Sequence, residues 1–75
     1  MNASERDYRV NINMREIMAR AGLNKKMVAE RSGMKRDVLY RILNCKRPVY
    51  GDEIPALAGA LNVSIDELFA PISAQ

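Results

Sequence analysis

The chain has 75 residues, a net charge of +3 and 48% hydrophobic residues, a size that suits one small domain with a marginal core. One cysteine and no histidine exclude an internal disulfide, a Cys/His metal cluster and a cysteine–histidine catalytic pair. No apolar run approaches the ~18 residues that span a bilayer, and the charged N-terminus does not fit a signal peptide, so we expect a single cytoplasmic domain over residues 1–75 that has no membrane partner.

Positive charge is concentrated in the middle of the chain. Residues 20–47 carry nine basic and two acidic side chains, whereas residues 48–75 carry four acidic and no basic side chains. Such segregation is typical of a surface that binds a polyanion. A solvated basic face without a partner is the alternative interpretation.

The first element combines two patterns. Its apolar residues alternate at first, which favours an extended segment, and further on they recur at helical spacing. We therefore predict an extended arm over about residues 1–11 and a first helix over about 12–21. Asn11 or Asn13 would cap this helix and Gly22 would end it.

Cap and breaker residues then define a second and a third helix. Asn24 caps a helix over about residues 25–32, which Gly33 ends. The third helix follows over about residues 36–44.

Two more short helices complete the chain. After a loop, Asp52 would cap a fourth helix that has Pro55 in its first turn, where a missing N–H costs little. Ser64 and Glu67 form a capping box for the fifth helix. The expected fold is therefore all-α, with five short helices.

The third helix separates into two faces when its residues are placed about 100° apart. The apolar face, which must pack on a core, carries Val38, Leu39, Ile42 and Leu43. The opposite face carries Arg36, Asp37, Tyr40, Arg41 and Asn44. Arginine can donate two hydrogen bonds to guanine, aspartate can accept one from cytosine, and a helix of this width fits the major groove of B-DNA.

The spacing of Ala29, Gly33, Leu39 and Ile42 resembles the helix-turn-helix motif of the phage repressor/Cro-like (XRE-type) family. Small Ala29 lets the third helix approach the second, and Gly33 takes a turn conformation that a Cβ would penalise. The stretch ILNCKRPVYGDEIPALAGALNVSIDELF resembles the two closing helices of the same family. The resemblance implies a lambda-repressor-like domain whose helix-turn-helix spans about residues 25–44.

The resemblance also makes the third helix the recognition helix. It implies base contacts from Lys35, Arg36, Asp37, Tyr40 and Arg41. We expect phosphate contacts from Lys25, Asn44, Lys46 and Arg47. Two positions depart from the family pattern, because Lys25 stands where glutamine is usual and Cys45 stands where glycine is usual. If the backbone at Cys45 needs a positive φ, the departure costs on the order of 1 kcal/mol.

The sequence therefore predicts a sequence-specific regulator of transcription that binds double-stranded DNA, most simply a repressor that occludes polymerase. We expect a homodimer on a palindromic operator, with two recognition helices in successive major grooves ~34–36 Å apart. The main alternative function is a protein-interaction module, such as an antitoxin, with the same fold.

The dimer surface is expected in the acidic C-terminal third, at Ile65, Leu68, Phe69 and Ile72. The segment over residues 8–12 is the alternative. We expect no catalytic residue, enzymatic activity, metal, cofactor or small-molecule substrate.

Overall fold

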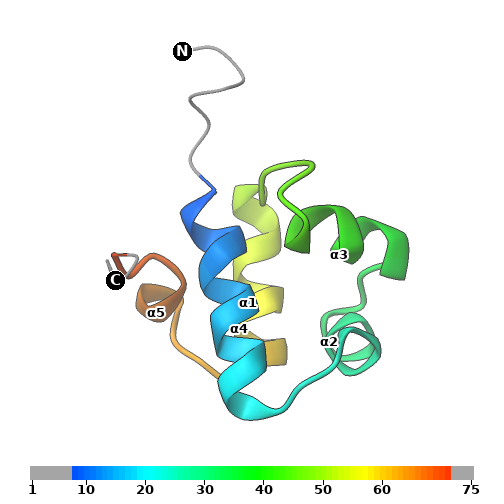
Figure 1. Cartoon of the computed structure of the whole chain (residues 1–75), viewed down its shortest axis with the longest axis horizontal. Coiled ribbons are helices and arrows are strands. Elements are labelled where there is room, and N and C mark those ends of the chain that lie inside the picture. Colours follow the sequence, from blue (N-terminus) through cyan, green and yellow to red (C-terminus); the bar gives the residue numbers. More distant parts are fainter. Residues whose placement is uncertain (1–7, 72–75) are drawn as a thin grey trace.

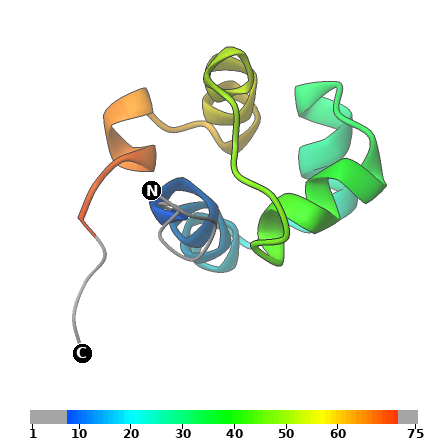
Figure 2. The same cartoon turned by 90° about the horizontal axis from the view of Figure 1, so that it is seen from above.

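The computed structural model describes residues 8–71, which form five α-helices and one 3₁₀ turn and contain no strand. The elements are α1 (Arg9–Ala21), α2 (Lys25–Ser32), α3 (Arg36–Leu43), η2 (Gly51–Glu53), α4 (Ile54–Leu61) and α5 (Ile65–Leu68). Helix α1 lies between α3 and α5 with α4 alongside it, and α2 packs against α3 and α4 (Figure 1 and Figure 2). The predicted all-α fold with five short helices is confirmed. Within residues 8–71, no helix has the length and apolar character needed to cross a membrane.

The beginning of α1 differs from the prediction. The helix begins at Arg9, so residues 9–11 are helical rather than part of an extended arm, and residues 1–7 lie outside the described part of the chain. Asn11 and Asn13 do not cap α1, because both lie within the helix and are buried. The apolar and polar residues alternate because α1 packs against α3 on one side and α5 on the other. Polar residues therefore occupy core positions where helical periodicity would require apolar ones.

The predicted boundaries of α2 are confirmed. The Asn24 side chain accepts a hydrogen bond from the Met27 N–H at 2.8 Å, which satisfies one of the free donors of the first turn. Gly22 and Gly33 follow α1 and α2 with φ of 71° and 74°, in the left-handed region that costs glycine nothing.

The end of the chain agrees with the prediction at α5 and differs at α4. Ser64 and Glu67 form the expected capping box, in which the Glu67 N–H donates to the Ser64 hydroxyl at 3.2 Å. Asp52 does not cap α4, because the η2 turn precedes the helix and Glu53 is its N-cap residue. Pro55 lies in the first turn of α4, as predicted.

The core gathers apolar side chains from all five helices. Its buried members are Val10, Met14, Ile17, Met18, Val28, Ala29, Leu39, Ile42, Leu43, Ile54, Leu57, Ala58, Ala60, Leu61 and Leu68. Leu39 and Ile42 of α3 have no exposed surface, and each such side chain contributes ~1.5–3 kcal/mol by its burial. These anchors fix the rotation of α3 and so decide which of its faces meets solvent.

Candidate nucleic-acid interface

The predicted division of α3 into two faces is confirmed. Leu39, Ile42 and Leu43 are buried and Val38 packs partly against them. The opposite face is exposed and carries Arg36, Asp37, Tyr40, Arg41 and the C-cap residue Asn44. Lys35, the N-cap residue of α3, is also exposed. Arg36, Asp37, Tyr40 and Arg41 therefore share one solvent-facing surface of α3, and Lys35 is exposed directly before the helix.

A contact joins this surface to the N-terminus of α2. The Lys25 Nζ lies 4.6 Å from the centroid of the Tyr40 ring, within the range of a cation–π interaction worth ~0.5–1 kcal/mol at an exposed site. The positive end of the α2 dipole lies at the same place. The structure thus brings together one predicted phosphate contact and one predicted base contact from two helices.

The turn after α3 has the hydrogen bonds of a Schellman motif. The Lys46 N–H donates to the Arg41 carbonyl at 2.7 Å and the Cys45 N–H donates to the Ile42 carbonyl at 3.0 Å. Cys45 has a φ of 56°, so the positive φ considered for this position is present and carries a cost on the order of 1 kcal/mol. Asn44 and Lys46 are both exposed on this turn.

Arg47 differs from the other predicted phosphate contacts, because its guanidinium is engaged within the protein. Its Nη1 and Nη2 donate to the two carboxylate oxygens of Glu53 at 3.0 and 2.7 Å, and Nη1 also donates to the Pro48 carbonyl at 2.8 Å. It also lies 4.6 Å from the centroid of the Tyr50 ring. The hydrogen bonds from Arg47, with one from the Tyr50 N–H, lower the pKa of the Glu53 carboxyl. The bond to Glu53 raises the pKa of Arg47.

This pair has a structural role. The Arg47 and Glu53 side chains are 15% and 20% exposed, respectively, and a bidentate arginine–carboxylate pair is both short and directional. It connects the turn after α3 to the beginning of α4.

Arg15 of α1 is a cation that the sequence-based reasoning did not include. With Met18, Lys25, Leu43 and Asn44 it lines a hollow of about 250 Å³. The hollow therefore brings Arg15 close to two predicted phosphate contacts, one on α2 and one at the end of α3. No local pattern marks Arg15, because only the packing of α1 against its neighbours creates this arrangement.

Comparison with family models then identifies the fold. A model of the Cro/C1-type helix-turn-helix DNA-binding domain matches residues 13–73. The chain belongs to the Cro/C1-type helix-turn-helix family. Its structure is similar to that of the restriction-modification controller protein C.AhdI from Aeromonas hydrophila, with a TM-score of 0.75 and 29% sequence identity over 83% of this chain and 94% of the other. Comparison with curated proteins gave no match.

The family assignment makes this Cro/C1-type protein a DNA-binding regulator of transcription. The structural match agrees with this assignment, because it extends over 94% of the controller protein at 29% sequence identity. Among the described residues, no three His, Cys, Asp or Glu side chains are grouped as a metal site would require.

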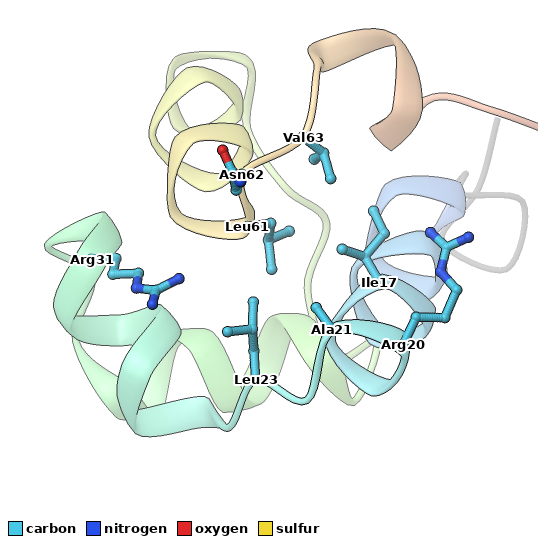
Figure 3. Close-up of a pocket in the computed structure, with 8 residues that line it drawn as sticks. All are labelled: Ile17, Arg20, Ala21, Leu23, Arg31, Leu61, Asn62 and Val63. Carbon is cyan, nitrogen blue, oxygen red and sulfur yellow. The ribbon is translucent and has the colours of Figure 1, made fainter.

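A second hollow of the Cro/C1-type domain lies away from the predicted DNA contacts. It measures about 350 Å³ and is bordered by the ends of α1 and α4 and by α2 (Figure 3). Its walls include the apolar side chains of Ile17, Ala21, Leu23, Leu61 and Val63. Arg20 and Arg31 come from opposite sides of it (Figure 3), and the Arg31 Nη1 donates to the Ala60 carbonyl at 3.3 Å. Arg20 also borders Asn13 and Glu67 in a neighbouring hollow, so it faces α5 rather than α3.

The predicted dimer residues have different environments. Ile65 and Phe69 are 45% and 49% exposed and lie four residues apart on one side of α5. Leu68 was expected on the surface, but it has no exposed surface and anchors α5 to the core, so that expectation was wrong. Ile72 lies outside the described residues.

Proposed function

We propose that this Cro/C1-type protein binds a palindromic operator as a symmetric homodimer and represses transcription by occluding polymerase. The observation that supports the proposal is the exposed face of α3. Arg36, Tyr40 and Arg41 project from a helix that Leu39 and Ile42 fix to the core. Base readout needs such a rigid placement, because a bidentate contact to a base edge tolerates little displacement.

The proposed contacts fall into two groups. Lys35, Arg36, Asp37, Tyr40 and Arg41 meet base edges, with the N-terminal end of α3 deepest in the major groove, as in helix-turn-helix docking. Lys25, Asn44 and Lys46 meet phosphates, and Arg15 joins them because it shares a hollow with Lys25 and Asn44. Arg47 is left out of this group because Glu53 already pairs with its guanidinium.

The proposed dimer surface is centred on Ile65 and Phe69. Both side chains are exposed, Ile65 on α5 and Phe69 as its C-cap residue, and α5 lies on the other side of α1 from α3 (Figure 1). The acidic residues Asp66 and Glu67 on the same helix make this side unsuitable for DNA. Pairing at α5 leaves both α3 helices free to enter successive major grooves ~34–36 Å apart.

Selection of bound sites from a random duplex library, followed by fluorescence titration over a series of salt concentrations, tests this function. We expect a palindromic site and an affinity that falls steeply as salt rises, because each neutralised phosphate releases counterions. Arg36→Ala should cost ~1–3 kcal/mol per subunit and relax the choice at one base pair in each half-site, whereas Lys46→Ala should weaken all sequences and lower the salt slope by about one per subunit, or about two for the dimer. Arg20→Ala is the matched control, since Arg20 faces α5.

The alternative is a protein-interaction module of the antitoxin type, whose basic face meets an acidic protein. No DNA binding even at low salt would refute the proposed function and favour this alternative. If Arg36→Ala weakened every sequence equally, Arg36 would be a phosphate contact and would not read a base.

A further inference from the structure

Asn11 is a buried polar residue that connects α1 to the turn after α3. It is 1% exposed, and its Nδ2 donates to the Ile42 carbonyl at 2.8 Å and to the Arg47 carbonyl at 2.9 Å. Both amide hydrogens are therefore used, and both acceptors are backbone groups far away in the sequence. The two carbonyls bracket the turn that carries Asn44 and Lys46.

The hydrogen bonds within this turn are local. They run from Asn44 to Tyr40, from Cys45 to Ile42 and from Lys46 to Arg41. Local bonds define the shape of the turn, and the Arg47–Glu53 pair ties its end to the beginning of α4, but neither fixes the position of the turn relative to α1. Asn11 fixes the position of the turn at both ends, and a residue in a strained conformation, such as Cys45, persists only where the surrounding structure holds it.

Asn13 makes the same kind of connection on the other side of α1. It is 7% exposed, and its Nδ2 donates to the Leu68 and Ala70 carbonyls, each at 2.8 Å. Two residues along a helix are separated by about 200°, so Asn11 and Asn13 face opposite sides. They form chemically equivalent bonds, one pair at the turn after α3 and the other at the end of α5.

We propose that Asn11 is a positioning residue for DNA binding, which holds the turn after α3 where Lys46 can reach a phosphate while α3 occupies the major groove. This inference rests on the proposed function. Removing the amide leaves the helix and its local turn intact but frees the turn to move relative to α1. The turn then no longer holds Lys46 within reach of the phosphate.

Comparison of Asn11→Ala with Asn13→Ala in the full-length protein tests the inference. The assay is titration of the selected duplex over a salt series, at a temperature where both variants are folded and at concentrations where sedimentation shows the wild-type oligomeric state. Asn11→Ala should lower the salt slope of the dimer by about two, the loss of one phosphate contact in each subunit. Asn13→Ala should keep the wild-type slope, although it loses two hydrogen bonds of the same kind. Equal slopes for the two variants would overturn the inference.

A double variant separates positioning from a general loss of stability. If Asn11 acts through Lys46, then Asn11→Ala combined with Lys46→Ala should have the same slope as Lys46→Ala. A further fall of about two in the double variant would overturn the inference, because Asn11 would then affect a different contact in each subunit. If Asn11→Ala does not fold, Asn11→Ser with Asn13→Ser as its control serves the same comparison, since serine keeps one donor.

Failure of the function and failure of the inference give different results. Wild-type protein that does not bind the duplex at low salt would refute the proposed function. Wild-type binding with a steep slope, together with matching slopes for the Asn11 and Asn13 variants, would refute only the positioning role.

Discussion

Replacing Cys45 by glycine should stabilise the protein. Cys45 has a φ of 56°, in the left-handed region where a Cβ costs roughly 1–2 kcal/mol. Glycine removes that cost, and the backbone bonds from Cys45 to Ile42 and from Lys46 to Arg41 can stay as they are. The turn after α3 would keep its shape with less strain.

Two opposing contributions reduce the gain. Glycine has more freedom in the unfolded chain, which costs roughly 0.5–1 kcal/mol, and the partly buried Cys45 side chain loses its contacts. The difference between the two backbone contributions, the strain relieved and the freedom added, is about 0–1.5 kcal/mol, with a middle value of about 0.7 kcal/mol. For a domain of this size, the middle value corresponds to a rise of about 3–6 °C in the melting temperature.

Thermal unfolding followed by circular dichroism measures the effect, with Asn62→Gly as the matched control. Asn62 ends α4 with a φ of 59°, but asparagine tolerates this region much better than cysteine does. We expect a smaller gain at Asn62 than at Cys45. If Cys45→Gly failed to raise the melting temperature, or raised it less than Asn62→Gly did, the assignment of strain to Cys45 would be refuted.

Three further predictions concern the interface, the ion pair and the dimer. Arg15→Ala should lower the salt slope of DNA binding by about one per subunit, or about two for the dimer, while Arg20→Ala leaves it unchanged; equal slopes would remove Arg15 from the phosphate contacts. Glu53→Gln should lower stability by about 1–2 kcal/mol at neutral pH, because it breaks the charge-assisted bonds to Arg47. The pKa of Glu53 in the folded protein lies below its ordinary value of 4.5, so this stabilisation is present above that value and is lost as the pH falls through the folded pKa. The melting temperatures of wild type and Glu53→Gln should therefore converge in acid, and a constant difference would contradict the linkage. Phe69→Lys should shift the sedimentation equilibrium from dimer towards monomer, and an unchanged dimer would exclude this side of α5 from the interface.

Several features of the fold could be predicted because their causes lie within a few residues. Asn24 caps α2 through the N–H of Met27, three residues away, and Ser64 does the same for α5 through Glu67. The apolar spacing of α3 likewise predicted its buried and exposed faces, since helical geometry alone relates those positions. The helix-turn-helix resemblance rested on the spacing of Ala29, Gly33, Leu39 and Ile42, and the family assignment confirmed it.

The candidate site was predicted less completely, because several of its residues depend on distant partners. Arg47 and Lys46 are neighbours in the sequence and carry the same charge, but the Arg47 guanidinium pairs with Glu53 and is thereby engaged within the protein. Arg15 gave no local signal and joins Lys25 only through helix packing. Leu68 looked like part of an apolar surface, but the short α5 needs it as an anchor.

The sequence by itself therefore determined the helices, most of their ends and the basic face of α3. The tertiary structure decided the roles of the two asparagines of α1, either of which the sequence had suggested as a helix cap. The carbonyl partners of Asn11 lie 31 and 36 residues away, and those of Asn13 lie 55 and 57 residues away. A buried amide must satisfy its donors, but only the packing of α1 against α3 and α5 determines which carbonyls it reaches.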